Sequence, residues 1–244
     1  MSTEFQYLTG FGNEFETEAL PGALPIGQFS PQKVKYDLYA EQFNVTAFTA
    51  PRADNRRNWF YRIRPSVVQG DYTSMDNGLL RTAPITEVPT PPTMLRWNPI
   101  DIPSEATDFV DGLVTMAANG SANGQVGIGI HVYVANKSMQ GRYFYNADGE
   151  LLFVPQQGEM VLHTECGKLA VKPGEIAVIP RGIKFSVEVI GDTIRGYICE
   201  NYGHPYILPE RGPVGANGYT NERDFQYPVA AFEDLEGDFE LVAK

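Results

Sequence analysis

The stretch from residue 142 to 190 constrains the fold more than any other part of this 244-residue sequence. It contains short runs of β-branched, aromatic and other apolar residues, each bounded by glycine, proline or asparagine. The runs are 142–146, 150–154, 160–164, 168–172, 175–179 and 184–190. Many short strands at this spacing are typical of an antiparallel meander or jelly roll. We therefore expect a mainly all-β fold.

One of the turns in this stretch has the spacing of a known motif. Gly174 is followed by five residues, Pro180, one residue, Gly182, two residues and Phe185. This spacing resembles the second motif of the cupin family, which has a metal-binding histidine where this chain has Phe185. An ordinary strand followed by a turn would give the same glycine and proline spacing.

The first cupin motif consists of two histidines one residue apart, followed by a glutamate. It can be laid over Phe144, Asn146 and Glu150, and only the glutamate matches. A metal needs nitrogen, sulfur or oxygen donors, and the phenyl rings of Phe144 and Phe185 offer none. We expect a cupin-like, jelly-roll β-sandwich barrel with degenerate metal motifs, in which Glu150 is an ordinary solvated carboxylate.

Composition and net charge indicate which elements, binding partners and cellular location we expect. The 24 glycines and 18 prolines favour short strands and turns, with few short helices. A formal net charge of -11 argues against a general nucleic-acid or anionic-membrane surface. The N-terminal residues lack the pattern of a signal peptide, and Cys166 and Cys199 lack paired-ligand spacing. We expect a cytoplasmic protein with reduced, buried thiols.

The order of the segments suggests three regions. Residues 1–104 read as an extended aromatic and Pro/Gly-rich segment with early strands, including 59–63, packed on the barrel. Residues 105–232 read as the degenerate cupin-like domain, with a helical turn near 107–108, a loop at 117–124 and further strands at 125–134 and 194–200. Residues 233–244 form a third region, in which 239–243 alternate like a strand.

The histidines do not form a local metal motif. His131, His163 and His204 are too far apart in the sequence to share a helix or a strand as ligands. We interpret them as ordinary strand and loop residues. The alternative is that two of them converge with Glu150 or Glu165 as a facial triad, which would make the chain a metal enzyme in its own right.

Beyond these motifs, longer stretches of the chain resemble the N-terminal part of the homogentisate 1,2-dioxygenase family. Several together, in this order, are specific to it, and they extend over nearly all of the sequence. The stretches are 8–14, 18–25, 38–41, 59–66, 95–97, 145–150, 179–185 and 212–218.

The resemblance implies an Fe(II) dioxygenase of phenylalanine and tyrosine breakdown, which opens the ring of homogentisate with O2 to give maleylacetoacetate. In the family, the iron ligands and catalytic residues lie in the C-terminal half, so no such residue is carried over to this chain. We expect no catalytic or metal residue here and no bound cofactor. The resemblance also implies a β-rich domain that packs on a C-terminal catalytic cupin domain, with residues 233–244 as the start of the connection to it. This domain would take part in homo-oligomers, trimers or hexamers.

Two further expectations concern ligands. As an alternative function, the chain could be an autonomous, non-catalytic scaffold that binds a small molecule or a partner. In addition, the glycine-flanked segment with Phe11 and Asn13 could fold over a neighbouring active site and contact the substrate, although simple subunit packing would explain its aromatic residues as well.

Overall fold

The computed structural model describes residues 5, 7–9, 17–25, 34–51, 53–207 and 222–244. The chain divides into two compact units. One combines residues 1–75 with 209–234, and the other combines 76–208 with 235–244. These divisions lie at different positions from the expected ones after residues 104 and 232. The reason is that segments far apart in the sequence pair with one another, as in the case of β1 and β11.

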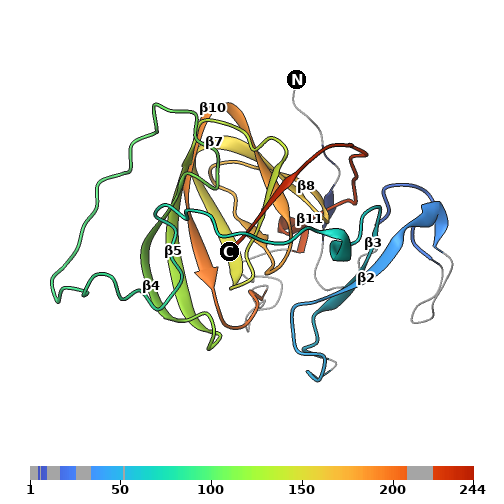
Figure 1. Ribbon diagram of the computed structural model, residues 1–244, viewed down its shortest axis with the longest axis horizontal. Coiled ribbons are helices and arrows are strands. Elements are labelled where there is room, and N and C mark those ends of the chain that lie inside the picture. Colours follow the sequence, from blue (N-terminus) through green and yellow to red (C-terminus); the bar gives the residue numbers. More distant parts are fainter. Residues whose placement is uncertain (1–4, 6, 10–16, 26–33, 52, 208–221) are drawn as a thin grey trace. The chain divides into compact units, whose positions relative to one another are not determined.

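The larger unit is built on one eight-stranded sheet (Figure 1). Its strands follow the order β12-β6-β10-β5-β4, and β7 pairs with β10, β8 and β9. The strands are β4 (Leu113–Ser121), β5 (Val126–Ala135), β6 (Arg142–Tyr145), β7 (Glu150–Thr164), β8 (Gly167–Val171), β9 (Ala177–Ile179), β10 (Phe185–Asn201) and β12 (Glu240–Ala243). All of the pairings are antiparallel except that of β12 with β6.

Two long strands curl this sheet into a barrel. β7 joins the expected strands 150–154 and 160–164, and β10 joins 184–190 and 194–200. Their shared ladder shifts register between Ile190 and Gly196, opposite Gly158, which has a φ of 76°. Such a bulge bends both strands without ending them. The sequence therefore predicted the positions of these strands correctly. However, it predicted two short strands in each place where the structure has one long, bent strand.

The expectation of a loop at 117–124 is wrong. Most of these residues belong to β4, which pairs with β5 from Leu113 to Ser121 and is followed by a tight turn. Alanine, asparagine and glycine have low strand propensity, but backbone pairing with a neighbouring strand overrides such preferences. β4 also forms an isolated parallel bridge with Leu79.

The core of the barrel is aromatic. The ring of Phe109 contacts four other aromatic rings, with centroid-to-centroid distances of 5.7 to 6.2 Å. These rings belong to Tyr133, Phe144, Phe153 and Phe185. The expected helical turn places it there: Gly112 N donates to Asp108 O, and the Asp108 carboxylate accepts from the amides of Val110 and Asp111. Arg142 Nη1 donates to the same carboxylate, which neutralises this buried charge.

An extended segment precedes the barrel strands. From Gln69 to residue 112 the structure contains turns and an isolated bridge but no helix or longer strand, as its prolines predict. Residues near 84–104 leave the strands as a wide loop, drawn in green in Figure 1. Met94 and Trp97 on this loop are 98% and 56% exposed.

The smaller unit has little interior of its own among its described residues. β1 (Tyr7–Thr9) pairs with β11 (Gln226–Pro228), and β2 (Tyr39–Asn44) pairs with β3 (Arg57–Arg62), which contains most of the expected strand at 59–63. Short 3₁₀ turns lie at Lys35–Asp37, Ser66–Val68 and Glu222–Asp224. In the described part of this unit, Pro65 alone is fully buried. No described helix has the length and hydrophobicity needed to span a membrane.

Candidate functional site

Two of the positions that match the cupin metal motifs, Phe144 and Phe185, meet in the core of the barrel. Phe144 and Phe185 are register partners on β6 and β10, and their ring centroids are 5.7 Å apart in an edge-to-face contact. Both side chains are buried and pack on Phe109. Two of the four positions therefore contribute hydrophobic packing in place of metal donors.

The other two motif positions are used for hydrogen bonds within the chain. Asn146 Nδ2 donates to Glu200 Oε1, and Glu150 Oε2 accepts from Tyr206 N at 2.7 Å. Glu150 is buried, with 7% of its surface exposed, so the interpretation of this residue as a solvated carboxylate is wrong. The physical reason is that the backbone amide of Tyr206 replaces water as its partner.

The most deeply buried polar side chain among the described residues of the barrel is Glu200, and no pattern in the sequence pointed to it. Its carboxylate is fully buried on β10. Oε2 lies 2.9 Å from His131 Nε2, and Oε1 and Oε2 lie 2.6 and 2.8 Å from Lys244 Nζ. A carboxylate only accepts hydrogen bonds, so His131 Nε2 and Lys244 Nζ are the donors.

These partners determine the charge state of Glu200. Burial by itself would raise the pKa of this carboxyl group, because it removes water from the charged form. The hydrogen bond from His131, the positive charge and hydrogen bond of Lys244, and the hydrogen bond from Asn146 outweigh burial and lower the pKa of Glu200 to about 2. Glu200 is therefore a carboxylate at neutral pH.

A second layer of contacts orients the cluster. His131 Nδ1 lies 2.9 Å from Thr115 Oγ1 on β4, which holds the imidazole ring between two polar partners. Asp148 Oδ2 lies 3.1 Å from Lys244 Nζ and accepts from Thr82 Oγ1 at 2.7 Å. Burial raises the pKa of the nearby Tyr202 hydroxyl, so this group remains a neutral phenol. The cluster is a closed hydrogen-bonded network.

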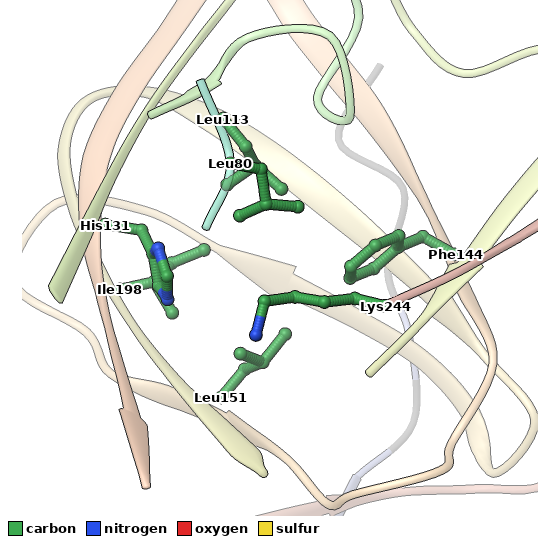
Figure 2. Close-up of a pocket in the computed structure, with 7 residues that line it drawn as sticks. All are labelled: Leu80, Leu113, His131, Phe144, Leu151, Ile198 and Lys244. Atoms are coloured by element: carbon green, nitrogen blue, oxygen red, sulfur yellow. The ribbon is translucent and has the colours of Figure 1, made fainter. Parts of the chain in front are cut away.

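The space beside this network is small. Figure 2 shows the Lys244 side chain entering the barrel, with Nζ on the side of His131 and Leu151. Its methylene stem lines a cavity of about 10 Å³ together with apolar side chains, and this volume holds about one water molecule. The lining residues are Leu80, Leu113, His131, Phe144, Leu151, Ile198 and Lys244. An aromatic acid does not fit in this cavity.

The predicted histidine alternatives do not come together. His131 bonds Glu200, whereas His163 Nε2 lies 2.8 Å from Glu188 and is partly exposed. His204 lies in a loop, where its carbonyl oxygen accepts from Asn201 Nδ2. Across the described ranges, no group of three or more His, Cys, Asp and Glu side chains is arranged to hold a metal ion.

The sequence also pointed to the two cysteines, to Glu165 and to two residues of a possible lid. Cys166 and Cys199 form no disulfide, and the expectation that both are buried is wrong, because each is only partly buried. Glu165 accepts from Lys184 N at 2.9 Å and forms an ion pair with Lys184 Nζ. Phe11 and Asn13, the candidates for a lid, lie outside the residues that the structure describes, and their role stays a prediction.

A match to a protein-family model identifies the family to which this chain is related. The model of the family described as "Homogentisate 1,2-dioxygenase N-terminal" matches residues 6–244. The chain belongs to this family. The match extends over both compact units, and so the family resemblance seen in the sequence is confirmed.

The barrel is a cupin-like jelly roll, as the sequence predicts. Among solved structures, this chain is similar to an RmlC-like cupin family protein with a double-stranded β-helix fold from Methanocaldococcus jannaschii. The identity is 17%, the coverage is 45% of this chain and 94% of that chain, and the TM-score is 0.32. It is also similar to a cupin superfamily protein from Desulfitobacterium hafniense, with 15% identity, coverage of 40% and 82%, and a TM-score of 0.30.

Membership of the homogentisate 1,2-dioxygenase N-terminal family raises the question of iron. The described residues of this chain do not fit an iron ion. Phe144 and Phe185 have no donor atom, and His131 and Glu200 are bound to each other, with Lys244 supplying the cation in that network. We therefore assign no metal ligand to the described part of the barrel.

Proposed function

We propose that this chain forms the non-catalytic N-terminal domain of an Fe(II)-dependent homogentisate 1,2-dioxygenase. The whole enzyme would open the ring of homogentisate with O2 to give maleylacetoacetate, in phenylalanine and tyrosine breakdown. The observation that carries this proposal is the family match over residues 6–244. In this proposal, iron and substrate are held by residues other than those of the described barrel.

The chemistry of the barrel supports a non-catalytic role. General acid–base catalysis and metal catalysis both need polar groups that face a space where a substrate can bind. Here Glu200, His131 and Lys244 face one another, and the adjoining cavity holds about one water molecule. Cys166 and Cys199 form no disulfide, which is consistent with the cytoplasmic location that we propose.

The outer face of the barrel supports a role in assembly. Val132 on β5, Tyr197 on β10 and Val154 on β7 are register partners on this face, and Tyr197 is 40% exposed. In the next row, Ile130, Cys199 and Leu152 are paired in the same way. A contiguous apolar face is typical of a surface that another protein covers. We propose that the domain contacts the catalytic domain and takes part in a homo-oligomer, a trimer or hexamer, with no nucleic-acid or membrane partner.

The test is homogentisate-dependent oxygen uptake. The purified chain is reconstituted anaerobically with Fe(II), desalted and compared with the same sample without iron, and a full-length homogentisate 1,2-dioxygenase serves as the positive control. Circular dichroism establishes that both samples are folded. We expect no uptake and no retained iron, whereas iron-dependent uptake would overturn the proposal.

The alternative of an autonomous binding module makes a different prediction. It requires the isolated chain to bind homogentisate or a related aromatic acid without turnover. We expect titration calorimetry to detect no binding, because the barrel interior is filled by the aromatic core and the Glu200 network. Saturable binding in the absence of uptake would favour the alternative.

A further inference from the structure

Strand β12 has few contacts of its own to hold it on the barrel. It pairs with β6 over only four residues, from Glu240 opposite Arg142 to Ala243 opposite Tyr145, and the pairing is parallel. Short parallel pairs are slightly less stable per residue than antiparallel ones. Of its side chains, only Val242 is fully buried. Side-chain anchors at its ends therefore matter for its position.

One anchor lies at each end of the strand. At the start, Arg142 Nε lies 2.7 Å from Glu240 Oε2, but the Glu240 side chain is 58% exposed, so this ion pair is weakened by water. At the other end, Lys244 follows β12, and its side chain is only 8% exposed. The stem of Lys244 lies among Leu80, Leu113 and Leu151 (Figure 2). Its ammonium group donates to Glu200.

The groups around Lys244 Nζ suit a primary ammonium ion. Nζ is 2.6 and 2.8 Å from the two oxygens of Glu200 and 3.1 Å from Asp148 Oδ2. An ammonium group has three N–H donors, which matches three oxygen acceptors. The ring of Tyr202 adds an aromatic face, with its centroid 5.6 Å from Nζ.

The acceptors are held in place by other parts of the barrel. His131 and Asn146 fix the Glu200 carboxylate, and Thr82 donates to Asp148. None of these supporting contacts comes from β12. The site is therefore formed by the rest of the barrel, and the strand contributes only its occupant.

We propose that Glu200, Asp148 and Tyr202 form an internal ammonium-binding site whose occupant is Lys244, and that filling this site docks β12 on the barrel. The ligand class is a primary alkylammonium ion, tethered here as a lysine side chain. This role does not depend on whether the whole enzyme acts on homogentisate, because it concerns only contacts within the barrel.

The first test is chemical rescue. Lys244→Ala in the full chain removes the atoms that n-propylammonium supplies. At an amine concentration about ten times the dissociation constant, we expect propylammonium to raise the Tm of K244A by about 4 °C. The wild type should not respond, because its site is filled, and neither should the double variant K244A/E200Q. 1-Propanol and tetramethylammonium at matched concentration and ionic strength should also leave K244A unchanged.

Equal shifts in the wild type and K244A, or an undiminished shift in K244A/E200Q, would overturn the proposal. A second measurement decides the matter if K244A does not fold. In Glu200→Gln at neutral pH, we expect the amides of Leu241 to Ala243 to exchange about tenfold faster than in the wild type, the change expected for loss of one charge-assisted hydrogen bond. Glu200 is the register partner of Gly129 on β5, so exchange in the β4–β5 ladder reports the global loss of stability of this variant. Unchanged exchange of β12 would contradict the docking role.

Discussion

At the scale of single residues, the barrel has aromatic side chains at cupin metal positions and a buried, hydrogen-bonded ion pair elsewhere in its interior. The positions where cupins have metal-binding histidines carry Phe144 and Phe185, and these rings pack in the core. The most deeply buried carboxylate among the described residues is instead Glu200, balanced by Lys244 and hydrogen-bonded by His131 and Asn146. A buried carboxylate without such partners would be protonated or would destabilise the fold.

Glu200 predicts a specific loss of stability in acid. Its pKa is about 2 in the folded protein, below the ordinary value of 4.5, so its ionised form stabilises the fold above about pH 4.5. This contribution, on the order of 3 kcal/mol, is lost as the pH falls from about 4.5 to 2.

The measurement is urea unfolding of the wild type and Glu200→Gln at several pH values. We expect E200Q to be less stable at neutral pH by about 3 kcal/mol, because it leaves Lys244 without a full charge partner. Below pH 4.5 its free energy of unfolding should fall less steeply than that of the wild type. Parallel pH profiles of the two proteins would show that Glu200 is not the group responsible.

These residues differ in how well the sequence could predict them. Phe185 was identifiable, because the spacing of Gly174, Pro180 and Gly182 marks the position of a missing ligand. Glu200 was not, since nothing near it in the sequence indicates which way it faces. Its partners lie on β5, at the end of β6 and after β12, and only the sheet brings them together.

At the scale of elements, the close packing of β5, β7 and β10 depends on glycine at specific positions. Gly196 on β10 is the register partner of Tyr133 on β5 and of Pro155 on β7. A Cβ atom at this position would lie 2.3 Å from the Tyr133 hydroxyl oxygen and 2.5 Å from Val154 O. The backbone carbonyl cannot move without disturbing the ladder, so the position has no room for a side chain.

We therefore predict that Gly196→Ala destabilises the chain by about 3 kcal/mol, as expected for overpacking a buried site. Gly70→Ala is the matched control, because a Cβ atom there meets nothing within 4 Å. The control should change stability by less than about 0.5 kcal/mol. Thermal or urea unfolding of the two variants measures both effects, and a G196A protein as stable as G70A would contradict this account.

The alternating sequence of β5 predicts a strand, but it does not predict which face of the strand is buried. Alternation predicted β5 well, but the face that carries His131 and Tyr133 is the buried one, whereas Ile128 is 40% exposed. Ile128, Ile130 and Val132 therefore lie on the opposite, outer face of the sheet, and Val134, farther along that face, is covered and only 3% exposed. Hydrophobicity alone would predict that the isoleucines and valines of β5 face the interior of the barrel. The interior face instead carries His131, because its polar partners lie there.

At the scale of the whole molecule, the hydrophobic core belongs to one unit. Every buried hydrophobic side chain among the described residues, from Leu80 to Val242, lies in the unit formed by 76–208 and 235–244. The described part of the other unit buries only Pro65. Burial of apolar surface is the main source of stability, so the barrel holds most of what is needed to fold.

This distribution predicts the outcome of a deletion. A chain that begins at residue 76 should keep the far-ultraviolet circular dichroism of a β protein and unfold in one cooperative thermal transition. Residues 1–75 expressed alone should show no cooperative transition, because their described part has no core. Loss of cooperative unfolding in the chain from residue 76 would show that the two units fold only together.

The sequence alone determined the all-β class, the positions of most strands, the degenerate cupin motifs and the family, because these depend on local alternation, on turn residues and on motif spacing. Tertiary structure alone decided that β7 and β10 are continuous, that β4 is a strand, and that Glu200 and Lys244 meet inside the barrel. The physical reason is that burial and charge pairing depend on which strands become neighbours. Residues 131, 200 and 244 interact only after the sheet has curled.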